Sequence, residues 1–301
     1  LPATQPVMRK PLILLCLLAT PALLAWAVWY WEAPPEAQYT DVVPTRPAVA
    51  TRRPNLQILR IGHRGAARFA PENTLASIEK ALELGFEYIE MDVRSTRDSV
   101  PVLLHDTTVD RTTNGTGRIG ELTYAAVAQL DAGSWFGPEF TGERIPRLED
   151  ALQLIQGRAC VFWDTKGPPT ARMVELFQQY GFDDDCLIIT FGGLGRGENA
   201  RKVEPLLAFW PEAPLLPVAR DPREVRAALA NYPHIRGVRV MRRLATPELV
   251  DTAHRLGLLV VSITLQQADN ADYYQRLMRA GVDATMLENI DEFDALLRTL
   301  E

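Results

Sequence analysis

Four short groups of polar residues stand out because their side chains could act together on a phosphate ester. They are His63-Arg64-Gly65, Pro71-Glu72-Asn73-Thr74, Glu90-Met91-Asp92 and His105-Asp106. The whole chain has only four histidines, and two of them belong to these groups. This concentration of rare and charged residues marks the first half of the chain as the place to look for chemistry.

The four groups supply what phosphoryl transfer needs. Two nearby carboxylates, Glu90 and Asp92, suit a hard cation such as Mg²⁺ or Ca²⁺, and a bound cation neutralises charge on a phosphate. The imidazoles of His63 and His105 would let one group take a proton while the other gives one. The guanidinium of Arg64 would add a planar fork for phosphate oxygens.

The apolar pattern predicts that strands position these groups. Residues 59–62 form a short apolar run ahead of His63, and residues 100–104 form another ahead of His105. Between them, residues 88–93 alternate, so that Glu90 and Asp92 would share one face of a strand. Each polar group would therefore end a strand or follow one.

Each group also has a simpler interpretation. A Glu-x-Asp pair on a strand is usually a solvated face, and a histidine at a strand end is more often a polar residue without catalytic work. Residues 71–74 would be only a helix start, with Asn73 or Thr74 as N-cap of a helix over 75–84 that Gly85 ends. The joint occurrence of the groups at successive strand ends favours a functional site.

Residues 61–152 resemble the glycerophosphodiester phosphodiesterase family, whose motifs run H-R-G, P-E-N-T, E-x-D, H-D, T-x-x-G-x-G and P-x-L-x-E-x-L. The last two read here Thr113-Asn114-Gly115-Thr116-Gly117 and Ile145-Pro146-Arg147-Leu148-Glu149-Asp150-Ala151-Leu152. The resemblance implies an α/β fold, a (β/α)8 TIM barrel with a small insertion after the strand that carries the second histidine. Residues 106–142 would be that insertion.

The resemblance also implies roles for the polar groups. Glu90 and Asp92 would bind a divalent metal cation, Mg²⁺ or Ca²⁺. His63 and His105 would serve as general base and general acid, and which of them is the acid stays open. Arg64 would hold the phosphate of the substrate.

The third carboxylate ligand of the family lies in an E-x-K motif on a later strand. The matching place here is Asp164-Thr165-Lys166, which follows the apolar run 159–163. Asp164, in place of the family's Glu, would complete the metal site, directly or through a water. Lys166 would bind the substrate phosphate.

The rest of the chain fits a parallel barrel. Further strands are predicted at 187–190, 237–241, 258–264 and 283–287, and helices at 171–180, 222–230, 246–256 and 272–280. Strands and helices that alternate over this length predict a barrel, whose reacting groups lie at the carboxyl ends of its strands.

The C-terminal half departs from the family pattern. Ile263-Thr264 and Leu287-Glu288-Asn289 stand where the family has W-T and T-D-x-P. Residues 191–220, rich in glycine and proline, look unusual for a plain strand and helix. These departures predict a changed substrate pocket beside an intact phosphate and metal site.

The N-terminal region predicts a membrane anchor. Residues 11–31 hold no charged side chain, which is long enough for a helix to span a bilayer, and Arg9 and Lys10 precede them. A cleaved signal peptide is the alternative. The predicted organisation is a cytoplasmic N-terminus at 1–10, a single-pass anchor at 11–31, a proline-rich linker at 32–55 and the barrel domain at 56–301. The catalytic domain would lie outside the cytoplasm, on the periplasmic side in a bacterium.

Composition limits the partners. A net charge of −6 argues against nucleic acid, for which a basic patch would be expected. The three cysteines show neither zinc spacing nor a disulfide framework, so Cys160 and Cys186 are predicted to be buried thiols.

The resemblance implies a metal-dependent phosphoric diester hydrolase. It would convert glycerophosphodiesters to glycerol 3-phosphate and an alcohol, with the two histidines as general acid and base. Two alternatives remain: a membrane-facing hydrolase of the lysophospholipase D type, and a non-catalytic barrel that binds lipid head groups or a partner protein.

Overall fold

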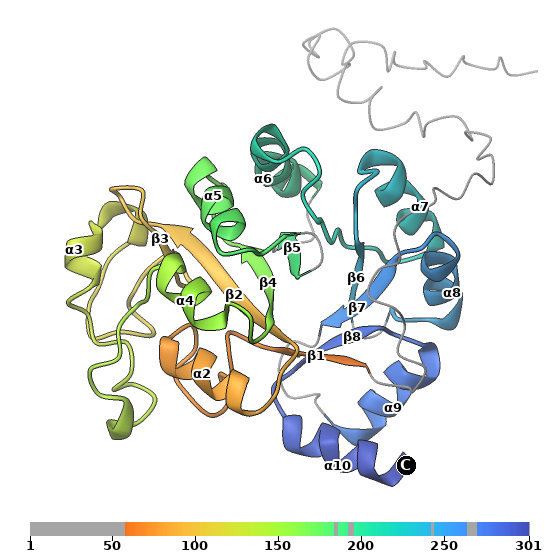
Figure 1. The fold of residues 1–301 in the computed structure, drawn as a ribbon, viewed down its shortest axis with the longest axis horizontal. Coiled ribbons are helices and arrows are strands. Elements are labelled where there is room, and N and C mark those ends of the chain that lie inside the picture. Colours follow the sequence, from red (N-terminus) through yellow and green to blue (C-terminus); the bar gives the residue numbers. More distant parts are fainter. Residues whose placement is uncertain (1–57, 184–185, 192–195, 242–243, 264–269, 301) are drawn as a thin grey trace, which may run out of the picture. The chain divides into compact units, whose positions relative to one another are not determined.

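The computed structural model describes residues 58–183, 186–191, 196–241, 244–263 and 270–300 (Figure 1). The predicted anchor at 11–31 and the linker at 32–55 lie outside these residues. Among the described helices, none is both long and apolar enough to cross a membrane.

Parallel strands form a barrel wall with helices on the outside, which confirms the predicted barrel (Figure 1). Neighbours in the wall follow the order β5-β4-β2-β1-β8-β7-β6. The strands are β1 (Leu59–Gly62), β2 (Tyr88–Ser95), β4 (Cys160–Thr165), β5 (Leu187–Phe191), β6 (Gly237–Met241), β7 (Leu259–Ile263) and β8 (Ala284–Leu287).

Residues 214–219 occupy the eighth position of the wall, between β5 and β6. The amide of Leu216 donates to the carbonyl of Ile189 on β5 at 2.8 Å, and the amide of Arg239 on β6 donates to the carbonyl of Pro217 at 2.8 Å. Both pairings are parallel. Pro214 and Pro217 lack an amide hydrogen, so this segment makes a sparse ladder, which hides it from a search for strand patterns.

The strand predicted at 100–104 is present as β3 (Pro101–Leu103), but it lies outside the barrel wall. It pairs antiparallel with the end of β2, at Val93↔Leu103 and Ser95↔Pro101, whereas β2 pairs in parallel with β4. A parallel neighbour would need a crossover of a dozen or more residues, and residues 96–100 allow only a tight turn. The expectation that this strand belongs to the parallel barrel was therefore wrong.

An insertion separates β3 from α4 (Leu148–Ile155) and includes the predicted segment 106–142. It contains η1 (Ile119–Glu121), α3 (Tyr124–Val127) and η2 (Pro138–Phe140). Its apolar side chains pack with Val102 of β3 in one hydrophobic cluster, whose other members are Leu104, Val109, Ile119, Val127, Ala132 and Ile145. The insertion is thus a small module with a separate core.

Four of the helices that cover the barrel begin at side-chain caps, which are Thr or Asp residues directly before the helix. Thr74, Thr170, Asp221 and Thr246 each accept a hydrogen bond from the first turn of the helix that follows, which satisfies amides that have no partner within the helix. These four helices are α2 (Leu75–Glu83), α5 (Ala171–Gln179), α7 (Pro222–Asn231) and α8 (Pro247–Arg255). The remaining helices after β4 are α6 (Arg196–Phe209), α9 (Ala271–Ala280) and α10 (Ile290–Leu300).

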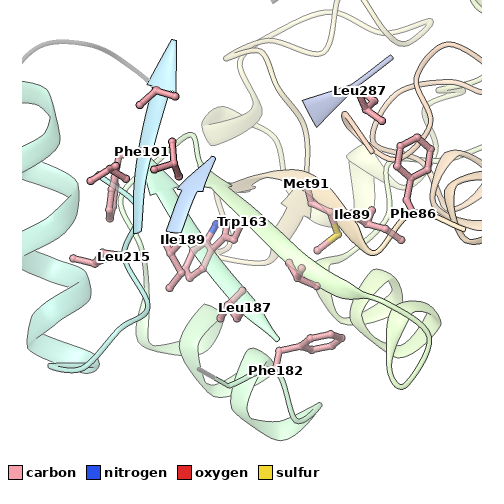
Figure 2. Packing of buried hydrophobic residues seen from close by; sticks show 14 of the residues in the cluster. Phe86, Ile89, Met91, Trp163, Phe182, Leu187, Ile189, Phe191, Leu215 and Leu287 are labelled. Atoms are coloured by element: carbon pink, nitrogen blue, oxygen red, sulfur yellow. The ribbon is translucent and has the colours of Figure 1, made fainter. Parts of the chain in front are cut away.

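Two hydrophobic layers follow from the alternation of side chains along the strands. On β4, Val161 and Trp163 point toward the helices, while Phe162 belongs to a cluster inside the barrel. Trp163 stacks on Phe177 of α5 with ring centroids 4.6 Å apart, and Figure 2 shows Trp163 beside Ile189, its neighbour in register on β5. Burial of each large side chain stabilises the fold by roughly 2–3 kcal/mol.

Cys160 and Cys186 form a disulfide, so the prediction of two buried thiols was wrong. The register explains the pairing: Val161 lies opposite Leu187, so the residues just before them begin neighbouring strands. Their Cα atoms lie 4.6 Å apart. The sequence separation of 26 residues gives no hint of this contact, because only the parallel pairing of β4 with β5 creates it.

Candidate active site

Three carboxylates meet at the carboxyl ends of β2 and β4. Glu90 and Asp92 lie on the inward face of β2, and Asp164 on β4 is in register with Asp92. All three are buried, and Asp92 is only 1% exposed. Oxygen atoms from the three side chains lie within 4.8 Å of one another. This set is hereafter called the acidic cluster.

Burial and mutual repulsion perturb the acidic cluster. Burial, followed by the charge of Asp92, raises the pKa of Glu90 well above its usual range. Burial also opposes ionisation of Asp92, but the nearby charges of Lys166 and Arg64 outweigh it and lower the pKa of Asp92. The Nζ of Lys166 lies 2.6 Å from an oxygen of Asp164 and 3.0 Å from Asp92 Oδ1.

The acidic cluster has the properties of a site for a hard divalent cation. Among the described residues, Asp164 Oδ1 is buried without a hydrogen-bond partner, and Asp92 Oδ1 has no hydrogen bond and only the ammonium of Lys166 beside it at 3.0 Å. Buried carboxylate oxygens in this state are costly unless a cation offsets their charge. Carboxylate oxygens are the ligands that Mg²⁺ and Ca²⁺ prefer. Glu90, Asp92 and Asp164 therefore fit such an ion, and the donor set does not choose between the two metals.

The turn after β1 brings Arg64 onto the acidic cluster. The backbone of Arg64 is left-handed, with φ of 50°, and its amide donates to Glu90 Oε2 at 2.7 Å. Its Nη1 donates to Glu72 at 2.8 Å, and its Nε lies 3.3 Å from Asp92. The following Gly65 has φ of 84°, and a Cβ there would lie 2.2 Å from the hydroxyl of Ser77. Glycine is thus required for the turn that aims the arginine.

The Pro71–Thr74 group serves both as a helix start and as part of the site. Thr74 is the N-cap of α2. Asn73, with φ of 58°, donates from Nδ2 to Asp92 Oδ2 at 2.8 Å and accepts from the Asp92 amide at 3.1 Å. The helix-start interpretation was therefore correct but incomplete, because the same turn holds a carboxylate of the acidic cluster in place.

Each of the two histidines shares a hydrogen bond with a carboxylate through Nδ1. His63 Nδ1 lies 2.9 Å from Glu288 Oε1, and His105 Nδ1 lies 2.7 Å from Asp106 Oδ1. The hydrogen bond to His63 lowers the pKa of Glu288 more than burial raises it. Such a carboxylate orients the ring and leaves Nε2 as the nitrogen that can exchange a proton.

Arg111 joins the segment that follows His105 to the Pro71–Thr74 turn. Its Nε donates to Asp106 Oδ2 at 2.7 Å, and its two terminal nitrogens donate to Glu72 at 2.7 and 2.8 Å. The hydrogen bond from Arg111 is the main cause that lowers the pKa of Asp106 to about 2. A continuous polar chain thus runs from Arg64 through Glu72, Arg111 and Asp106 to His105.

Four charged residues of this region escaped the sequence motifs. Arg94 continues the inward face of Glu90 and Asp92, and it donates to the carbonyls of His105 and Lys166. Arg94 lies two residues after Asp92 on the same strand, so the alternation of side chains could have placed it on the inward face. For the other three, no pattern in the sequence predicted the contact, since they reach the site only through the insertion or the closure of the barrel: Arg111, Arg239 and Glu288.

The fold and the site together define a barrel enzyme, with its polar groups gathered at the carboxyl ends of the strands. The family model of the glycerophosphoryl diester phosphodiesterase family matches residues 63–292. The chain belongs to this family of phosphoric diester hydrolases.

Individual relatives agree with this assignment. The glycerophosphodiester phosphodiesterase of Caldanaerobacter subterraneus subsp. tengcongensis is 29% identical over 252 residues, which cover 81% of this chain and 99% of that protein. The crystal structure of the Agrobacterium tumefaciens glycerophosphodiester phosphodiesterase is similar with a TM-score of 0.69, 29% identity and coverage of 79% of this chain and 100% of that one. The structure of an Oleispira antarctica phosphodiesterase, solved with the product sn-glycerol-3-phosphate, is similar with a TM-score of 0.68 and 27% identity. The match covers 79% of this chain and 96% of that one.

Proposed function

We propose that the protein hydrolyses glycerophosphodiesters to glycerol 3-phosphate and an alcohol with the help of a divalent cation and two histidines. The observation that carries this proposal is the placement of two carboxylate-bound imidazoles at the same end of the barrel as the buried acidic cluster. A cation site beside an acid and a base is the combination that phosphodiester hydrolysis requires.

The acidic cluster would hold the cation through Glu90, Asp92 and Asp164. When bound, the cation supplies charge neutralisation on the phosphate oxygens. Lys166 and Arg64 now pair with the same carboxylates. A bound cation would neutralise the charge of those carboxylates, so Lys166 and Arg64 would be able to bind the substrate phosphate instead. Arg64 would bind it as a planar fork and Lys166 as a point charge.

The two histidines would share the proton transfers. Nε2 of one takes the proton of the nucleophile as the new bond to phosphorus forms, and Nε2 of the other gives a proton to the alcohol oxygen as its bond to phosphorus breaks. The nucleophile is water or the neighbouring glycerol hydroxyl. Attack by the hydroxyl releases the alcohol and forms a cyclic phosphate, which water then opens to glycerol 3-phosphate, with the two histidines in exchanged roles. Glu288 and Asp106 would stabilise the protonated state of the imidazole to which each is bonded.

Release of free alcohol from glycerophosphocholine tests this function. Turnover by the full chain with Mg²⁺ or Ca²⁺, its loss in EDTA and a drop of about 10²–10⁴-fold in His63→Ala and in His105→Ala are expected. His234→Ala, which removes an exposed histidine, is the matched control and should turn over normally. Undiminished turnover in EDTA would contradict the role of the cation, and an active His63→Ala or His105→Ala would contradict the acid–base pair.

Lysophospholipids are the second substrate class that we propose, because the insertion carries an exposed aromatic side chain, Trp135. Trp135 is 43% exposed and makes an edge contact with Phe136, and amphipathic aromatic rings favour lipid–water interfaces. A higher kcat/KM for a lysophospholipid than for glycerophosphocholine in the same assay would assign the lysophospholipase D-type activity. Binding of both without turnover would assign a binding barrel.

We also propose that the barrel domain lies outside the cytoplasm, held at the membrane by residues 11–31. The disulfide between Cys160 and Cys186 supports this location, since structural disulfides persist in oxidising compartments and are rare in the cytoplasm. Thiol alkylation of the protein from intact bacterial cells provides the test. Protection of both cysteines until reduction is expected, and two freely alkylated thiols would argue for a cytoplasmic barrel.

A further inference from the structure

Arg239 is a buried arginine on β6 that takes no part in the proposed chemistry. Arg239 lies on β6 between Val238 and Val240, which both belong to the hydrophobic layer beneath the helices. Arg239 therefore points into the barrel interior, because successive side chains of a strand face opposite sides. It is only 7% exposed.

The guanidinium of Arg239 reaches the level of the acidic cluster. Its Nη1 donates to Thr190 Oγ1 on β5 at 3.1 Å. Thr190 is in register with Asp164, and Asp164 is in register with Asp92. The head group of Arg239 thus extends the same row of inward-facing side chains from which two carboxylates of the cluster project.

The charge of Arg239 lacks a close partner within the described part of the chain. No described carboxylate lies within the 4.0 Å of a salt bridge, and its Nε has no hydrogen-bond partner. Burial lowers the pKa of Arg239, while Asp164 and Glu90 act in the opposite direction. A buried cation without an ion pair is expensive unless a field of opposite charge stabilises it, and the acidic cluster is the nearby source of that field.

We propose that Arg239 is a permanent counter-charge of the acidic cluster, which weakens the binding of a divalent cation and strengthens the binding of the phosphate anion. Arg239 joins three other basic side chains that interact with the carboxylates of the acidic cluster, which are Arg64, Arg94 and Lys166. The repulsion between a fixed guanidinium and a divalent ion loosens the ion, and the same guanidinium attracts a phosphate. This inference rests on the proposed cation site.

Two opposite effects in one variant test the proposal. In calorimetric titrations of the full chain, Arg239→Met should bind Ca²⁺ about tenfold tighter and sn-glycerol 3-phosphate in EDTA about tenfold weaker than the natural protein. Arg239→Gln, which keeps a polar group for Thr190, is measured alongside in case the Met variant does not fold. Arg239→Lys keeps the charge and should bind both ligands nearly as the natural protein does.

Arg226→Met is the matched control, since it removes one positive charge from the exposed face of α7 and should change neither affinity. Weaker binding of both ligands by a variant that is folded by circular dichroism would overturn the proposal, as would an unchanged Ca²⁺ affinity in the folded Met and Gln variants. If the natural protein itself binds neither Ca²⁺ nor Mg²⁺, the proposed cation site fails first and this inference fails with it. The natural protein's titration therefore separates the two failures.

Discussion

The two halves of the barrel, β1 to β4 and β5 to β8, differ in how many charged side chains they bury and in how these are paired. At the ends of β1, β2 and β4, the charged side chains of Arg64, Asp92 and Lys166 each contact two or more polar groups. Along β5 to β8 the interior is mostly apolar, with Ile188, Val261 and Met286 in its inner cluster. Arg239 brings a charged side chain into that half, and it has no close ion pair with any described residue.

This contrast indicates a division of labour between the halves. The first half holds its charges in a network that would fix the geometry of the proposed phosphate chemistry. A displaced carboxylate there would disturb several neighbours at once. The second half contributes shape and apolar surface, and its sequence departs from the family's W-T and T-D-x-P motifs. Substrate preference can thus change there while the phosphate chemistry stays intact.

Among these changes, removal of Lys166 from the half with β1, β2 and β4 should lower the free energy of unfolding most. Lys166→Met leaves Asp92 and Asp164 without their shared cation, which should lower the free energy of unfolding in EDTA by about 4 kcal/mol. Ca²⁺ should restore part of it, because a metal can replace the lost charge. Urea unfolding in EDTA and in Ca²⁺ measures both. Lys80→Met, which loses only the exposed pair with Glu83, should cost less than about 1 kcal/mol; equal losses in the two variants would remove the contrast.

A cavity in the apolar half should reduce stability without touching the cation site. Ile263→Ala on β7 deletes buried methyl groups from the inner cluster and should lower the free energy of unfolding by about 3 kcal/mol. The dissociation constant for Ca²⁺, measured by calorimetry, should stay within about twofold of the natural value. A large change in Ca²⁺ affinity would mean that the halves are coupled.

Loss of Arg111 should show how far the network extends into the insertion. Arg111→Met frees Asp106 and Glu72, so His105 and Arg64 lose part of their support, and kcat for glycerophosphocholine should fall about tenfold, near 1.4 kcal/mol in barrier height. KM should change less. Arg118→Met removes an exposed arginine of the same insertion and should leave kcat unchanged. Equal kcat values for the two variants would confine the network to the barrel.

The smallest expected effect concerns acid stability. The pKa of Asp106 is about 2 in the folded protein and near 3.9 in an unfolded chain. The ionised carboxylate therefore stabilises the fold above about pH 4, and this contribution disappears as the pH falls toward 2. Asp106→Asn should flatten the fall in stability over that interval in urea unfolding at pH 2 to 5. An unaltered slope would show that Asp106 carries little of the acid sensitivity.

Most barrel strands could be predicted because strands buried on both faces are runs of apolar residues. β2, β6 and β7 lie within two residues of their predicted bounds at each end. The direction of β3 and the strand-like segment 214–219 could not be read from such runs. Direction depends on the length of the connection, and the segment's prolines remove the pattern that marks a strand.

The candidate site divides in the same way. His63 follows a parallel strand of the wall, so the chain order alone could place it at one end of the barrel. His105 follows the antiparallel β3, so its place beside the acidic cluster depends on the hairpin of β2 and β3. The partners of these residues could not be predicted, because Glu288 and Arg111 reach them only when the barrel closes and the insertion folds back. The bond between Cys160 and Cys186 likewise needs the register of two strands.

The left-handed backbone at Arg64 and Asn73 has a consequence for the evolution of this enzyme. A residue with a side chain adopts this conformation at a cost of about 1 kcal/mol or more, which glycine avoids. Replacement of either residue by glycine would relax the chain and would delete a guanidinium or an amide that contacts the acidic cluster. Selection for heat resistance alone would therefore tend to favour glycine at these two positions and so yield inactive proteins. A thermostable version of this enzyme has to gain its stability at other positions.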